Sequence, residues 1–269
     1  MADVTYFIFD IETVADGELI SRLRYPESDL APHAAVRQYR EDLLAEKGSD
    51  FIPPTYHLPI SLVVAKVNAD FELLDVVALD EPNCRPHEIT RLFWAGWEAY
   101  QYPTFVTFNG RTFDLPVMEL ASFRFGLSLK QWFAWNARNF DQPRYRFNHS
   151  AHLDLQEVLT NFGAARINGG LNLLAQLIGK PGKMDVSGDM VQDLFEQGEL
   201  ARINDYCRCD VLDTYFVFLR TSVLIGNLTL EQEQQRVRQA KQWIESNTEQ
   251  HPIYQQYLDN WGDWNNPWG

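Results

Sequence analysis

Two carboxylates, Asp10 and Glu12, lie two residues apart at the end of an apolar stretch that predicts a buried strand. Because side chains alternate across a strand, both should project from the same face of a sheet. Neighbouring carboxylates repel each other, and a hard cation with oxygen ligands, such as Mg²⁺ or Mn²⁺, relieves that repulsion. Taken alone, the pair is equally compatible with a polar strand end that caps nearby backbone groups.

Two further segments carry side chains of the same kind. FVTFNGRTFDLP places Asn109 and Asp114 in the loop and helix start that follow a strand, where functional loops of α/β sheets lie. NDYCRCDVLDT places Tyr206 and Asp210 four residues apart, and therefore on one face of a helix. Separately, Asp114 is interpreted as an ordinary helix N-cap, and the Tyr206–Asp210 pair as a hydrogen bond within the core.

Together the three segments resemble the exonuclease motifs of the DEDD superfamily, which are a strand Asp-x-Glu, a loop Asn-x4-Asp and a helix Tyr-x3-Asp, in that order. The chain is most similar to the tyrosine subclass, and within it to stand-alone bacterial proteins related to the exonuclease domain of family B DNA polymerases. The histidine subclass carries a His five residues before the last Asp, where this chain has Asp205. The resemblance covers about residues 4 to 220 and includes LNLLAQLIGKPGKMDVSG.

This resemblance implies an α/β protein of the ribonuclease H-like fold, with a mixed five-stranded sheet flanked by helices. It also implies two metal ions, Mg²⁺ or Mn²⁺, and hydrolysis of nucleotides from a 3′ end. When the metal ligands of the family are carried over residue by residue, the resemblance implies that Asp10 contacts both metals, Glu12 and Asp210 complete the first site, and Asp114 holds the second. Tyr206 then orients the attacking water, a role that suits a phenol with a pKa near 10 better than accepting a proton does.

Further residues near these motifs are candidate substrate contacts. The resemblance suggests that Phe108 and Asn109 contact the terminal nucleotide or its sugar, although a core Phe and a turn Asn explain them equally well. Lys183, with Lys180, is a candidate contact to backbone phosphates, although exposed loop lysines are common. Asp154 is interpreted as the N-cap of a following helix rather than as a fifth site carboxylate.

The pattern of apolar and turn residues predicts the elements that position these side chains. Strands are expected at 4–11, 61–67, 71–79, 104–108 and 152–155. Helices are expected at 34–47, 86–100, 115–124, 171–178, 199–226 and 229–247, and one should begin near residue 156. We expect an exonuclease domain at 1–226, with an insertion or lid at 18–59. Residues 227–269 should form a helical C-terminal extension that ends in a Trp-rich tail.

Composition limits the class of protein. The chain has 269 residues, of which 45% are hydrophobic and 13% aromatic, and this indicates a folded globular protein. It lacks an apolar run of the roughly 20 residues that span a bilayer, its N-terminus lacks a signal-peptide pattern, and it has three cysteines. We therefore expect a cytoplasmic protein that does not enter a membrane and whose thiols are buried and inert.

The net charge of −14 is unevenly distributed. Residues 103–183 contain nine basic and five acidic side chains, so the excess acid lies outside this segment. A basic middle suits transient contact with a nucleic-acid strand, although a solvated surface explains it about as well.

The predicted function is a metal-dependent 3′-5′ exonuclease that acts on single-stranded 3′ ends, of DNA rather than RNA. Two alternatives remain, a non-catalytic nucleic-acid-binding module and a structure-specific endonuclease on the same fold.

Two other features of the sequence are less specific. GKPGK lacks the G-x4-G-K-[ST] pattern of a phosphate-binding P-loop. The tail tryptophans Trp261, Trp264 and Trp268 are candidate anchors for a protein partner, or part of a locally packed end.

Overall fold

A computed structural model describes residues 3–184 and 188–268. Its centre is one five-stranded sheet in the order β3-β2-β1-β4-β5, in which β1 pairs antiparallel with β2 and parallel with β4. At the two edges of the sheet, β3 pairs antiparallel with β2, and β5 pairs parallel with β4. This confirms the predicted mixed sheet of an α/β fold. The strands are β1 Tyr6–Ala15, β2 His57–Val67, β3 Leu73–Ala78, β4 Thr104–Thr107 and β5 His152–Asp154.

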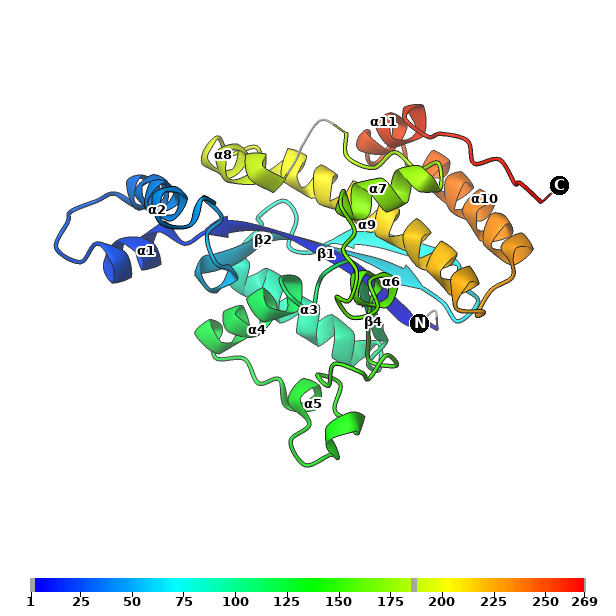
Figure 1. The fold of residues 1–269 in the computed structure, drawn as a ribbon, viewed down its shortest axis with the longest axis horizontal. Helices are drawn as coiled ribbons and strands as arrows, with labels where there is room; N and C mark the ends of the chain where they lie inside the picture. The colour runs from blue at the N-terminus through cyan, green and yellow to red at the C-terminus, as the bar shows by residue number, and fades with distance from the viewer. Residues whose placement is uncertain (1–2, 185–187, 269) are drawn as a thin grey trace.

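Helices cover both faces of the sheet (Figure 1). One face packs against α7 (Gly170–Leu177), α9 (Leu200–Leu224), α10 (Leu230–Ser246) and α11 (Ile253–Asp259), and the other against α3 (Pro86–Ala99) and α4 (Asp114–Phe125). The shorter elements are α1 Gly17–Arg24, α2 Pro32–Lys47, η1 Pro54–Tyr56, α5 Lys130–Phe133, η2 Asn139–Asp141, α6 Leu155–Leu159, η3 Gly188–Met190 and α8 Val191–Glu196.

The alternation of side chains along β1 divides the core into two layers. Ile8 belongs to the cluster under α9, whereas Phe7, Phe9 and Ile11 belong to the cluster under α3 and α4. Asp10 and Glu12 therefore share the parity of Ile8 and face α9.

The first strand is longer than predicted. The expected end at residue 11 is wrong, because β2 continues to pair with β1 as far as Ala15, which lies opposite His57. The register shifts between Glu12 and Thr13, so a bulge follows the second carboxylate. Asp10 and Glu12 lie inside a paired strand, and their backbone is held on that side.

On its other side, β1 is paired with β4 over a much shorter distance. The register between them runs only from Tyr6 opposite Thr104 to Ile8 opposite Val106. β4 ends at Thr107, and the chain then runs through a loop to α4. This short strand leaves room beside the second half of β1 for the start of α4.

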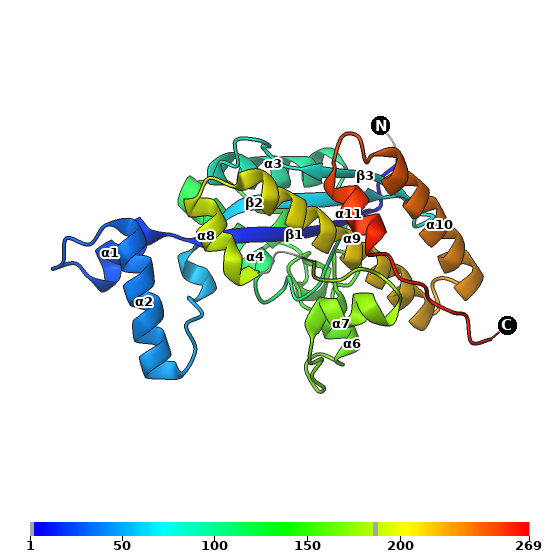
Figure 2. The same cartoon turned by 90° about the horizontal axis from the view of Figure 1, so that it is seen from above.

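The insertion after β1 forms two helices that stand apart from the sheet (Figure 2). α2 was predicted, but α1 was not. The two helices bury their own cluster of apolar side chains, which includes Ile20, Val36 and Tyr39. Gly17 is required at their junction, because an added Cβ would lie 2.3 Å from the carbonyl oxygen of Pro32.

The C-terminal residues pack against α9. The Tyr257 hydroxyl donates a 2.6 Å hydrogen bond to Asp213, and the Trp261 ring centroid lies 5.1 Å from that of Phe216. Trp264 stacks with Arg220, at 4.2 Å from the guanidinium carbon to the ring centroid, so it also packs on its own chain. Trp268 is 83% exposed. Within the described residues, no helix is long and apolar enough to cross a membrane.

Candidate metal centre

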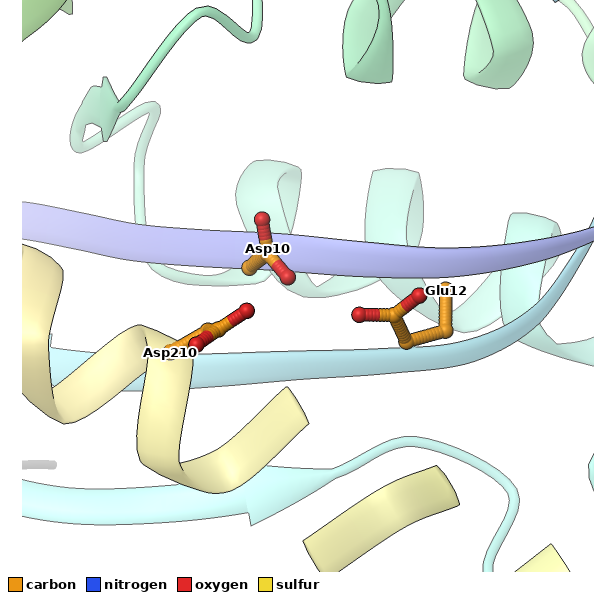
Figure 3. Close-up of side chains that lie close together, drawn as sticks. All are labelled: Asp10, Glu12 and Asp210. Carbon is orange, nitrogen blue, oxygen red and sulfur yellow. The ribbon is translucent and has the colours of Figure 1, made fainter. Parts of the chain in front are cut away.

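Three carboxylates meet between β1 and α9. Asp10, Glu12 and Asp210 each offer an oxygen atom, and these atoms lie within 4.8 Å of one another. Figure 3 shows the Asp10 and Glu12 side chains on the strand and Asp210 on the facing helix, directed toward a common space. The strand period and the packing of α9 across this face explain the arrangement.

Asp114 stands beside this group, although it is not one of the three that meet within 4.8 Å. It begins α4, is buried, and its carboxylate accepts a hydrogen bond from the backbone N–H of Ile11. The short β4 strand makes that contact available. The charges of Asp114 and Asp210 both raise the pKa of Asp10 and of Glu12, so Asp114 acts on the same strand carboxylates as Asp210.

Burial and mutual repulsion disfavour the ionised forms of these acids. Burial is the larger cause and raises the pKa of Asp10 and Glu12 well above the ordinary values. It raises the pKa of Asp114 to about 7 and that of Asp210 to about 6. Lys183 is exposed, and its charge lowers the pKa of Glu12 and Asp210, which places this predicted phosphate contact beside the centre. Because all the donors are carboxylate oxygens, the centre suits a hard divalent cation.

The phenol of Tyr206 contacts the same centre. Its hydroxyl hydrogen-bonds Asp210 one turn along α9, and burial followed by the charges of Asp210, Glu12 and Asp10 raises its pKa. Tyr206 therefore stays protonated at neutral pH and acts as a hydrogen-bond donor rather than as a base.

Cys207 is a neighbour that sequence reasoning missed. Its Sγ lies 3.3 Å from the backbone oxygen of Asp10 and 3.8 Å from Oδ2 of Asp10. Burial, then the charges of Asp10 and Glu12, raise the pKa of the thiol, so it stays neutral. All three cysteines are free and buried, as expected. The available signal was the three-residue spacing from Asp210, which places Cys207 on the same helix face.

The loop after β4 is held by Asp154. This carboxylate accepts hydrogen bonds from the N–H groups of Asn109 at 3.0 Å and Arg111 at 2.9 Å. It also caps α6 through the N–H of Gln156 at 3.0 Å, which confirms the N-cap interpretation. The Asn109 backbone is left-handed at φ 67°, and its side chain accepts a 2.6 Å hydrogen bond from the Thr112 hydroxyl.

The other predicted substrate contacts divide between core and surface. Phe108 is partly buried and packs against the cluster under α9. Lys180, by contrast with Lys183, is buried, and its ammonium lies 4.3 Å from the ring centroid of Trp261. Burial lowers the pKa of Lys180 to about 8. Lys183 remains the candidate for phosphate contact, and Lys180 anchors the tail.

Two grooves adjoin the centre. One of about 320 Å³ is lined by Glu12 together with Phe51, His57 and Phe113, so it lies between the metal centre and the insertion. Another of about 190 Å³ includes Tyr206 and Asp210 in its wall. Glu12 and Asp210 are therefore buried or partly buried side chains that still border a groove.

Comparison with known proteins identifies a family for this chain. A family model described as a predicted 3′-5′ exonuclease related to the exonuclease domain of PolB matches residues 49–261. No curated protein matches the chain at a significant level. Among solved structures, a family B DNA polymerase from the hyperthermophilic archaeon Pyrobaculum calidifontis superposes with a TM-score of 0.51 and 13% identity, over 82% of this chain and 24% of that protein.

A second solved structure is exonuclease I, with a TM-score of 0.37 and 12% identity, over 90% of this chain and 43% of that protein. This chain thus spans less than half of each of these two proteins. The superposition with the polymerase supports the predicted ribonuclease H-like fold.

Proposed function

Because this chain belongs to the family of predicted 3′-5′ exonucleases related to the exonuclease domain of PolB, we propose that it removes nucleotides from single-stranded 3′ ends in a metal-dependent reaction. The observation that carries the proposal is the meeting of Asp10, Glu12 and Asp210 within 4.8 Å. Three carboxylates that are buried or partly buried and repel one another form a site that a bound cation would stabilise.

The donor set fits Mg²⁺ or Mn²⁺. We propose two ions, with Asp10 contributing to both, Glu12 and Asp210 completing the first site, and Asp114 holding the second. Bound there, the ions would supply hydroxide near neutral pH and stabilise negative charge on the phosphate. Asp114 stands outside the group of three, which suits a second position beside the first.

The remaining residues act by positioning. We propose the tyrosine subclass, in which the Tyr206 hydroxyl orients the attacking water, because that phenol stays protonated and lies at Asp210. Lys183 would contact the backbone phosphate next to the cleaved bond, where its charge already acts on Glu12 and Asp210. Phe108 and Asn109 would contact the terminal nucleotide from the loop that Asp154 holds.

We propose DNA as the preferred substrate, in keeping with the relation of the family to the exonuclease domain of PolB and with the superposition on a family B DNA polymerase. The metal centre acts on phosphodiester groups that DNA and RNA share, so the choice of sugar depends on contacts to the 2′ position.

Digestion of 5′-labelled single-stranded DNA and RNA tests the proposal directly. With Mg²⁺ or Mn²⁺, we expect a ladder that shortens from the 3′ end, is abolished by chelator and is missing in an Asp10→Ala/Asp210→Ala variant. Internal cuts would replace the exonuclease with an endonuclease on the same fold. Binding without cleavage under any metal condition would refute catalysis and favour a binding module.

A further inference from the structure

The segment between α4 and β5 exposes large aromatic side chains that the metal centre does not use. Trp135 is 79% exposed, Phe140 57% and Phe147 53%. Figure 1 shows this segment around α5, on the side of the sheet that α4 covers. Isolated apolar residues on a surface are common, but a cluster of exposed rings within one short segment indicates a binding surface.

Arginines alternate with these rings and lie on their faces. The guanidinium carbon of Arg138 is 4.7 Å from the ring centroid of Phe140, and that of Arg146 is 5.9 Å from the centroid of Phe147. Arg144 lies 5.2 Å from the ring centroid of Phe133. We call the following set the stacking surface: Trp135, Arg138, Phe140, Arg144, Arg146 and Phe147.

Ion pairs hold the guanidinium groups of Arg144 and Arg146 in place while leaving these side chains about half exposed. Arg144 makes two hydrogen bonds to Glu119, at 2.7 and 2.9 Å, and Arg146 donates to Glu157 at 2.8 Å. The side chains of Arg144 and Arg146 remain 53% and 50% exposed. A planar cation that is oriented in this way keeps a face for stacking.

The stacking surface is positive on an acidic protein. The surface and its ion-pair network contain four basic and three acidic side chains, whereas the whole chain has a net charge of −14. The members of the network are Arg111, Arg138, Arg144, Arg146, Glu119, Asp141 and Glu157.

Contacts connect this surface to the metal centre. Glu157 bonds both Arg146 at 2.8 Å and Arg111 at 2.9 Å. Arg111 lies in the loop that leads to Asp114, and its backbone N–H donates a hydrogen bond to Asp154. The stacking surface therefore adjoins the loop that would hold the terminal nucleotide.

We propose that the stacking surface binds the part of a single strand that lies upstream of its 3′ end. The inference rests on the proposed function for the direction of the strand, but the binding itself does not depend on catalysis. Bases of a single strand are free to stack on aromatic rings and arginine planes, whereas those of a duplex are stacked on one another. Positive charge beside the rings attracts the phosphates between the bases.

Binding by the full chain, measured with chelator present, tests this surface apart from cleavage. The probe is a fluorescent single-stranded oligonucleotide of about 20 nucleotides, and the test variants are Arg138→Gln/Phe140→Ala and Phe147→Ala. The matched control is Arg238→Gln/Trp268→Ala, which removes one exposed arginine and one exposed tryptophan from the C-terminal part of the chain. Because one lost stacking contact weakens binding by about tenfold, we expect a tenfold rise in Kd for each test variant and less than twofold for the control.

Strand length provides the second measurement. On a trinucleotide, which is too short to reach beyond the metal centre, the test variants should cleave at the wild-type rate, and this would also show that they are folded. Unchanged affinity of both test variants for the long strand would overturn the inference. So would an equal loss on the trinucleotide. If the wild type proves inactive but the test variants still bind the long strand more weakly, the proposed function fails and the stacking surface stands.

Discussion

Replacing Asp210 by Asn should stabilise the metal-free protein, although it removes a proposed metal ligand. Asp210 is partly buried, and its desolvation raises its pKa from 3.8 to about 6. Asn has nearly the same shape, carries no charge, and keeps an oxygen that accepts the hydrogen bond of Tyr206. The substitution also removes one negative charge from the group that repels Glu12 and raises its pKa.

The magnitude follows from the pKa of Asp210. A carboxyl whose pKa is higher in the folded state contributes stability below its unfolded pKa, and that contribution is lost as the pH rises through the folded pKa. At about 1.4 kcal/mol per pKa unit, the step from 3.8 to about 6 costs the folded state about 3 kcal/mol at pH 8. At pH 5 the raised pKa of Asp210 destabilises the folded state by about half as much. At this pH, Asp210 is mostly protonated in the folded protein and mostly ionised in the unfolded one.

Urea unfolding followed by tryptophan fluorescence measures this difference. In chelator, Asp210→Asn should exceed wild type in free energy of unfolding by about 3 kcal/mol at pH 8 and by less at pH 5. Mn²⁺ at about a thousand times its Kd should reverse the order, because only the wild type gains the stabilisation of about 4 kcal/mol that a ligand at this concentration supplies. A variant less stable than wild type in chelator at pH 8 would refute the reasoning.

Three further predictions address single residues around the centre. Tyr206→Phe should lower kcat by about a hundredfold and leave the affinity for Mn²⁺ within about twofold, because the hydroxyl positions water rather than metal. Steady-state kinetics and a metal titration measure these two effects. Lys183→Ala should raise KM and reduce its dependence on salt concentration, whereas Arg238→Ala, at an exposed position of α10, should not. Asp154→Asn should lower the free energy of unfolding by about 1 to 3 kcal/mol in the same urea assay, because the new amide NH₂ would face the N–H of Asn109 or Arg111.

Much of the fold follows from local pattern. The strands of the sheet were predicted because β-branched and aromatic runs are bounded by turn residues. The helices α1, α5, α8 and α11 were missed, because each is short and depends on packing that the sequence does not display. Ile20 of α1, for example, is fully buried against the insertion's own cluster.

The candidate site was predictable in parts. The strand period brings Asp10 beside Glu12, and the helix period brings Tyr206 beside Asp210. Bringing the two pairs together requires that α9 cross the correct face of β1, which only the resemblance to a known family indicated. The hydrogen bond from Ile11 to Asp114 depends on where β4 ends, and no local pattern reveals that end. The roles of these residues in catalysis remain predictions.

The cost of the buried carboxylates distinguishes between the proposed enzyme and a metal-free binding module. Burial raises the pKa of Asp10, Glu12, Asp114 and Asp210, so each destabilises the fold when it ionises. A binding module would gain stability by losing any of them, and four negative charges would also repel the phosphates of its ligand. Bound cations reverse both effects, since they stabilise the ionised acids and attract phosphate. Charged groups that destabilise a fold are expected at active sites. The destabilising carboxylates therefore favour the catalytic proposal.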